Sequence, residues 1–258
     1  MRLTQIRNAT MAIDTHRQTL LLDPMLAPQG AIVPLKYFTR ARRRNPLVAL
    51  PDNTGQLLQN VQHCLITHCR KGHFDHLDRA GVKWLRQHQV TVHCSTADAG
   101  YLKGKGLKVH SYEPGRSAPF LGGQIELVEC LHGTGAVGKL MAHGYGFYIQ
   151  LPDEPSLYIC GDTVLTDTIR DFIRRKQPDV IVAPAGGAQF DFGGEIIMGV
   201  DEVMALADLA LGQVVANHLE ALDHCPVSRR ELIEAVSRRS WQTRFHVPAD
   251  GQSLIFNR

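Results

Sequence analysis

Metal-binding side chains follow several apolar, strand-like segments of this sequence. The four positions are His68 after 65–67, His132 after 127–131, Asp162 after 157–161 and His218 after 214–217. A short loop beyond the first of these positions adds His73, Asp75 and His76. Side chains at the ends of neighbouring strands can converge on one point, and imidazole together with carboxylate suits zinc, manganese or iron. The repeated placement therefore predicts one shared metal site.

The elements that must position these side chains are short strands and helices. Apolar and β-branched runs predict strands over 3–8, 10–15, 19–23, 61–67, 90–94, 124–131, 146–151, 157–160, 180–183, 214–216, 244–247 and 253–256. Helical spacing and a Ser228–Glu231 capping box predict helices over 78–89, 96–102, 166–176, 201–211 and 228–238. Residues 24–59 carry no regular pattern, and so long an irregular stretch inside a compact domain is usually functional. The alternation predicts sheets covered by helices in one domain.

Composition and charge narrow the class of protein. Of the 258 residues 44% are hydrophobic and 21% are charged, which is ordinary globular usage. No apolar run reaches the roughly 18 residues of a membrane-spanning helix, and the first residues lack a secretory signal, so a cytoplasmic protein without a membrane segment is expected. The net charge of +3 is too small to indicate a nucleic-acid partner. Arginines gather at 40–44, where we expect a solvated loop that governs substrate access.

Eight segments occur in an order typical of one known family. They are Gln5–Thr10, Leu22–Pro28, Arg44–Val48, Thr67-His68 with His73-x-Asp75-His76, His132–Gly135, Gly161–Thr163, Ala185–Ala188 and His218–Glu220. On these segments the sequence resembles the metallo-β-lactamase superfamily and, within it, the L-ascorbate-6-phosphate lactonase-like family. The resemblance implies an α/β (α+β) fold, a four-layer αββα sandwich, as a single hydrolase domain over residues 1–258.

The resemblance also implies a site for two divalent ions, Zn²⁺ or Mn²⁺, between the sheet edges. It assigns His68, His73 and His132 to one metal and Asp75, His76 and His218 to the other, with Asp162 bridging the two. Asp23 is similar to the aspartate that steadies the family's metal loop, the alternative being a plain Asp-Pro turn. Because bound metal lowers the pKa of water towards neutrality, a bridging hydroxide is the expected nucleophile, and Asp75 is expected to orient it.

The metal loop differs from the family pattern T-H-x-H-x-D-H by three extra residues. Cys69-Arg70-Lys71-Gly72 separates His68 from His73. In one register His68 stays at the strand end and the extra residues bulge outward. In the other register Lys71 replaces the first histidine, and the first metal loses a ligand because a protonated lysine has no lone pair. Ladder hydrogen bonds fix strand ends whereas loops absorb extra residues, which favours the first register.

The six cysteines form no C-x-x-C pair, and in a reducing compartment they are expected to be mostly free thiols. Cys69 is the one whose position raises a second interpretation. It is either a soft metal ligand or, as we favour, a free thiol of the loop.

Three features are expected to contact the substrate. They are the turn with Gly133 and Thr134, the turn with Gly186 and Gly187, and the pair Glu220 and His224. The alternative for this last pair is that it makes polar contacts at the start of a helix. Glycine-rich turns present N–H groups that suit anions.

The leading hypothesis is a metal-dependent hydrolase that opens a lactone or similar ester of a small anionic metabolite. One alternative is a phosphodiesterase or nuclease of the same fold, in which the arginine cluster would follow a phosphate backbone. Another alternative is a non-catalytic binding protein with a degraded metal site. The sequence does not decide the natural substrate, the identity of the metal or the oligomeric state, for which a homo-oligomer is one alternative.

Overall fold

The computed structural model describes residues 1–39, 41–70, 72–141 and 144–258, except for the side chain of Ala136. One sheet contains, in spatial order, β14 (Ser253–Ile255), β1 (Arg2–Arg7), β2 (Thr10–Asp14), β3 (Thr19–Leu22), β4 (Val61–Leu65), β5 (Thr91–Ser95) and β6 (Lys108–Tyr112). The second contains β13 (Phe245–His246), β12 (Gln213–Asn217), β11 (Val180–Pro184), β10 (Leu157–Ile159), β9 (Gly144–Gln150), β8 (Gly123–Cys130) and β7 (Ser117–Phe120). The helices are α1 (Thr54–Leu58), α2 (Arg79–Gln87), α3 (Thr96–Gly104), α4 (Gly135–Leu140), α5 (Asp167–Lys176), α6 (Val200–Leu209) and α7 (Arg229–Arg238).

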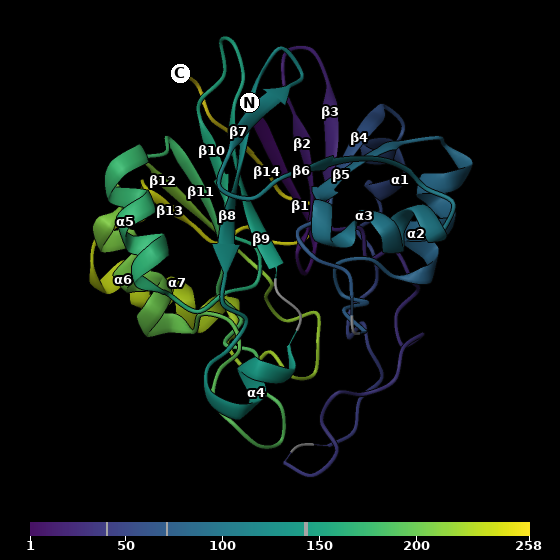
Figure 1. Ribbon diagram of the computed structural model, residues 1–258. Helices are drawn as coiled ribbons and strands as arrows, with labels where there is room; N and C mark the ends of the chain where they lie inside the picture. The colour runs from purple at the N-terminus through teal and green to yellow at the C-terminus, as the bar shows by residue number, and fades with distance from the viewer. Residues whose placement is uncertain (40, 71, 142–143) are drawn as a thin grey trace.

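The two sheets pack face to face between two layers of helices. Figure 1 shows α1, α2 and α3 on the outer side of the first sheet and α5, α6 and α7 on the outer side of the second. This arrangement is the α/β two-sheet sandwich, in a single domain, that the sequence predicts, and the prediction is confirmed.

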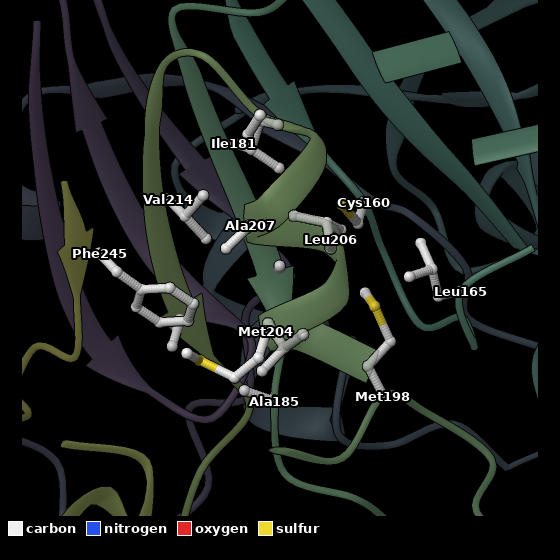
Figure 2. Close-up of a cluster of buried hydrophobic side chains, with 14 of the residues drawn as sticks. Cys160, Leu165, Ile181, Ala185, Met198, Met204, Leu206, Ala207, Val214 and Phe245 are labelled. Carbon is white, nitrogen blue, oxygen red and sulfur yellow. The ribbon is translucent and has the colours of Figure 1, made fainter. Parts of the chain in front are cut away.

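Three apolar layers hold the sandwich together. Leu65, Phe147 and Val182 belong to the cluster between the sheets. Figure 2 shows the layer between the second sheet and its helices, where Met204 and Ala207 of α6 lie beside Val214 of β12. Every residue of β11 is buried, as expected for a parallel strand covered on both faces. Apolar burial between the two sheets, and between each sheet and its helices, therefore holds the strands in place.

The second sheet brings the ends of three strands to one edge. β8 and β10 both run antiparallel to β9, and β10, β11 and β12 run parallel to one another. The carboxyl ends of β8, β10 and β12 consequently meet at the same edge, towards which Figure 1 shows β8 running as it approaches α4. The first sheet joins them there, because the Tyr145 N–H donates to the carbonyl of Thr67 at 3.1 Å.

Some predictions of local structure were wrong. The sequence pattern missed α1, α4 and the two edge strands β6 and β7. Edge strands are short and half polar, and β7 contains Pro119, which is tolerated only at an edge. The strands predicted over 244–247 and 253–256 lie in different sheets: β13 pairs with β12, whereas β14 pairs with β1.

One buried cation organises the irregular segment after β3. Arg7 is fully buried, and its guanidinium donates hydrogen bonds to the carbonyls of Met25 at 2.6 Å, Ala27 at 2.9 Å and Val48 at 3.0 Å. These bonds tie both ends of the segment to the end of β1. A long loop without regular structure is thereby held against the edge where the metal-binding side chains meet.

Candidate metal centre

Three imidazoles from two loops form the first half of the centre. His68 and His73 follow β4, and His132 follows β8, and each is at most 9% exposed. Nε2 of His68 lies 3.1 Å from Nδ1 of His73, and one ring nitrogen of each of the three histidines lies within 4.8 Å of the others. Nitrogens at this spacing can share one ion, because Zn–N bonds are about 2.0–2.1 Å long.

Two carboxylates and two imidazoles form the second half. One atom each of Asp75, His76, Asp162 and His218 lies within 4.8 Å of the others, and all four side chains are buried. Oδ2 of Asp162 lies 3.1 Å from Nε2 of His76, 3.3 Å from Nε2 of His218 and 3.6 Å from Nε2 of His132. A single carboxylate oxygen therefore faces imidazoles of both halves, which is the position that a bridging ligand needs.

The two halves differ in charge. Burial opposes protonation of His76, but the carboxylates of Asp162 and Asp75 outweigh it and raise the pKa of His76 well above its usual value. Burial would raise the pKa of Asp162, but the imidazoles of His218 and His76 lower it well below the usual range. In the first half, burial dominates and lowers the pKa of His73 to about 4. The first half thus offers neutral lone pairs, and the second offers carboxylate charge.

The residues present fit metal ions. Nε2 of His76 is buried and lies 3.1 Å from Oδ2 of Asp162 and 3.5 Å from Oδ2 of Asp75, without a well-aligned hydrogen bond to any described residue. An ion at the shared point would be bound by this nitrogen and by the carboxylate oxygens at the same time. Side chains that offer imidazole nitrogen and carboxylate oxygen to one point are the usual ligands of zinc and manganese.

Contacts behind the ligands fix the orientation of the rings. Nδ1 of His76 lies 2.8 Å from Oδ2 of Asp23, whose two oxygens also accept the Thr67 N–H at 2.8 Å and its hydroxyl at 2.6 Å. Nδ1 of His132 lies 2.8 Å from the Ile196 carbonyl. Such partners set which nitrogen of a metal-binding histidine is free for the metal. Asp23 therefore has the contacts that its resemblance to the family's loop-steadying aspartate implies.

A cavity of about 130 Å³ opens onto the centre. Of the residues named from the sequence, His73, Asp75, His132 and His224 line it. The rest of its described lining is Gly72 and six apolar side chains, Leu35, Phe74, Leu140, Met141, Phe190 and Ile196. Sequence reasoning missed these six, and the only signal was the expectation that the irregular segment, which contains Leu35, is functional.

The other residues expected at the substrate have structural contacts, and their role at the substrate stays a prediction. Gly133 and Gly186 allow close packing, since a Cβ would lie 2.9 Å from Ile196 in the first case and 2.1 Å from the His218 carbonyl in the second. The carboxylate of Glu220 pairs with Arg229 at 2.7 Å, at the start of α7, as in the alternative reading of that residue. Thr134 precedes α4, and Gly187 has φ +57° in the turn after β11. None of these five residues is part of the described cavity lining.

The structure places His68 within the imidazole group, at the position that the first register gives it. Lys71, on which the second register depends, lies outside the described residues. Cys69 is buried and is in neither group, and burial followed by the nearby Asp98 raises the pKa of its thiol. All six cysteines are free, as the sequence predicts.

The arginine cluster lies in an irregular, exposed segment, as expected; Arg40 is outside the described residues. Arg44 donates to the carbonyls of Gly30 and Ala31, at 2.6 Å and 2.9 Å. Arg43 lines a separate cavity of about 460 Å³ with Glu220 and Cys225. A role in substrate access therefore stays a prediction.

Comparison with known proteins identifies the family. The beta-lactamase superfamily domain matches residues 2–217. The UPF0173 protein YddR of Bacillus subtilis is 32% identical over 262 residues, covering 99% of this chain and 100% of its own length. A UPF0173 metal-dependent hydrolase of Azorhizobium caulinodans is 26% identical over 205 residues, 76% of this chain and 77% of its own. The chain belongs to the metallo-β-lactamase superfamily, in the group that contains these UPF0173 proteins.

Two solved structures have closely similar folds. An isothiocyanate hydrolase from Delia radicum gut bacteria superimposes with a TM-score of 0.89 at 29% identity, covering 100% of both chains. A possible metal-dependent hydrolase from Veillonella parvula gives a TM-score of 0.88 at 27% identity, covering 98% of both chains.

In the described part of this chain, no helix is both long enough and apolar enough to cross a membrane.

Proposed function

We propose that this metal-dependent hydrolase holds two divalent ions, Zn²⁺ or Mn²⁺, with Asp162 between them. His68, His73 and His132 would hold one ion, and Asp75, His76 and His218 the other. The support is the division of the ligand atoms into two groups and the single Asp162 oxygen that faces imidazoles of both. The buried Nε2 of His76, which faces the Asp162 oxygen at 3.1 Å without a well-aligned hydrogen bond to any described residue, supports an ion in the second group in particular.

The ions, when bound, supply a water of lowered pKa and polarise the substrate. The protein's own residues place and shield that chemistry. Asp75 lines the cavity, so its carboxylate can accept a hydrogen bond from the attacking water. Its Oδ2 also lies 3.3 Å from Nε2 of His218, a contact that favours the ionised carboxylate. Burial would raise the pKa of Asp75, but His76 and His218 lower it well below the usual range.

The cavity lining supports a small, uncharged electrophile as the substrate. Its described walls beyond the metal-binding side chains are apolar, apart from His224 and Gly72, and include no lysine or arginine. A charged group that lies against these apolar walls, away from the metal-binding side chains, would lose hydration without meeting an opposite charge in the described lining, which is costly. An organic isothiocyanate, R–N=C=S, meets this description, and the similar hydrolase from Delia radicum gut bacteria is named for that substrate. The apolar lining is the observation that carries this conclusion.

A lactone or similar ester is the second candidate, and it rests on the sequence resemblance. Its ring could occupy the same apolar walls, and its carbonyl carbon is attacked by the same nucleophile. An anionic handle finds less support, because Lys36, a buried cation that contacts the cavity residue Phe190, is already engaged. Nζ of Lys36 donates to the Phe190 carbonyl at 2.9 Å and to the Thr39 hydroxyl at 3.3 Å.

A substrate panel with metal analysis tests the proposal. Protein loaded with zinc or manganese is assayed with benzyl isothiocyanate, γ-butyrolactone and bis(p-nitrophenyl) phosphate, and its metal content is measured. We expect two ions per chain and turnover of the isothiocyanate above the other two probes. Preferential turnover of the phosphodiester would instead favour the nuclease alternative. Loss of all turnover together with an absence of bound metal would favour a binding protein.

The matched variant replaces an apolar wall residue by a cation. Phe74→Lys should weaken benzyl isothiocyanate hydrolysis while the metal content stays unchanged, since Phe74 lines the cavity and is not in either ligand group. Phe192→Lys is the control, because Phe192 is 76% exposed and is not in the described lining. Equal effects of the two substitutions would contradict an apolar substrate site.

A further inference from the structure

His224 is a buried imidazole in the cavity that no metal group uses. It is 4% exposed, lies in the loop between β12 and α7, and lines the cavity together with His73, Asp75 and His132. Its Nδ1 is buried and forms no hydrogen bond with any of the described residues. Since a buried polar atom without a partner is costly, an imidazole in such a cavity indicates a ligand that supplies the missing bond.

The ring is held rigidly in place. It stacks on Phe190 with the centroids 5.8 Å apart and the planes at 14°, and its backbone carbonyl accepts the Gln189 N–H at 2.9 Å. The preceding Asp223 accepts the Leu35 and Lys36 N–H groups at 2.9 and 3.0 Å, and the Asn45 amide at 2.9 Å. Contacts with Phe190 and Gln189, and with the segment 35–45 through Asp223, therefore position this imidazole on the cavity wall.

The imidazole is neutral near pH 7, because burial lowers the pKa of His224 to about 4. A neutral imidazole carries one N–H donor and one lone pair. A donor that needs no reorganisation is most effective where negative charge develops in the transition state, and a low-polarity site strengthens it.

We infer that His224 is a further catalytic residue, which donates a hydrogen bond to the substrate heteroatom that gains negative charge during attack. This inference rests on the proposed function. As the nucleophilic oxygen bonds to the electrophilic carbon, one electron pair of the C=N bond of an isothiocyanate, or of the C=O bond of an ester, moves onto the heteroatom. His224 keeps its own proton and stabilises that charge. Phe190 is the positioning residue that holds the ring.

Two substitutions separate hydrogen bonding from packing. His224→Phe keeps an aromatic ring against Phe190 but removes the donor, whereas His224→Gln keeps an N–H donor. For benzyl isothiocyanate we expect His224→Phe to lower kcat about 10²-fold, the usual effect of losing one such donor, with KM, metal content and Tm unchanged. His224→Gln should restore much of the lost kcat. A His224→Phe protein with wild-type kcat would overturn the inference.

A binding measurement separates this inference from the proposed reaction. Zinc-loaded protein labelled with ¹⁵N-histidine is titrated with sodium thiocyanate, which has the N–C–S atoms of the substrate and needs no turnover. The His224 ring signals are identified by their loss in His224→Gln. We expect them to be those of a neutral imidazole at pH 7 and to shift as thiocyanate binds. Unmoved His224 signals would overturn the role of His224, whereas absence of isothiocyanate turnover with shifted signals would overturn only the proposed reaction.

Discussion

Asp23 is 1% exposed and supports the centre from behind without belonging to either ligand group. Its two oxygens face three groups: the Thr67 N–H at 2.8 Å, the Thr67 hydroxyl at 2.6 Å and Nδ1 of His76 at 2.8 Å. In Asp23→Asn the side chain keeps its size but has one acceptor oxygen. Its amide then faces either the Thr67 N–H or the His76 N–H, and one donor is left without a partner.

The expected cost follows from these contacts. A hydrogen bond to a charged group contributes about 1.5–3 kcal/mol, and an unsatisfied buried donor costs about 1–3 kcal/mol. Part of this loss lowers the free energy of unfolding. The same loss lets the ring of His76 rotate away from the orientation that metal binding needs. Loss of such a partner typically lowers metal affinity about 10–100-fold. We therefore expect Asp23→Asn to weaken metal binding by that factor and to lower Tm.

Competition with a metal chelator measures the affinity, and thermal melting with and without metal measures the stability. Asp78→Asn is the matched control, because Asp78 is also buried and accepts the Ala27 and Gly81 N–H groups, at 2.6 and 2.7 Å, but contacts no metal ligand among the described residues. It should lower Tm and leave metal affinity unchanged. If the two variants lose the same metal affinity, the effect is a general loss of stability and the reasoning about His76 is refuted.

Three further outcomes follow from the centre. Asp162→Ala should abolish turnover, because its carboxylate oxygen faces His76 and His132 of the two halves at 3.1 and 3.6 Å; activity within a few-fold of wild type would refute a two-metal mechanism. His68→Ala should lower metal content and rate together, as measured by elemental analysis and kcat, and unchanged values of both would contradict the register that places His68 in the imidazole group. Nearby carboxylates raise the pKa values of His76 and His218, so protons compete with metal for both imidazoles; metal binding should release protons, and metal affinity should fall as the pH falls. Calorimetry in buffers of different ionisation enthalpy measures this proton release, and a heat independent of the buffer would contradict it.

Much of the fold could be predicted from local patterns. The capping box at Ser228 marks the start of α7, and the Ser228 hydroxyl does accept the Glu231 N–H at 3.2 Å. The apolar run 180–183 became the fully buried strand β11, because a strand covered on both faces needs apolar residues at every position. The edge strand β6 escaped prediction because its outer positions face solvent and accept polar side chains.

The candidate site, like the fold, could be predicted from the sequence only in part. The positions of His68, His132, Asp162 and His218 after apolar runs were visible in the sequence, since a strand end is a local feature. Their mutual distances were not, because these depend on two sheets meeting at one edge. The apolar cavity wall left no local signal, because a leucine or phenylalanine in a loop looks the same whether it lines a cavity or packs in a core.

The sequence by itself determined which metal-binding side chains are available and in which order the strands that carry them follow along the chain. Residue type and local periodicity are properties of short segments. Only the tertiary structure decided how the ligand atoms divide into two groups, and that Asp162 faces both. It also decided that Leu35, Phe74 and Phe190 enclose the centre and that Nδ1 of His224, among them, has no hydrogen-bond partner in the described part of the chain. These features are contacts between distant segments, and packing of the whole domain selects them.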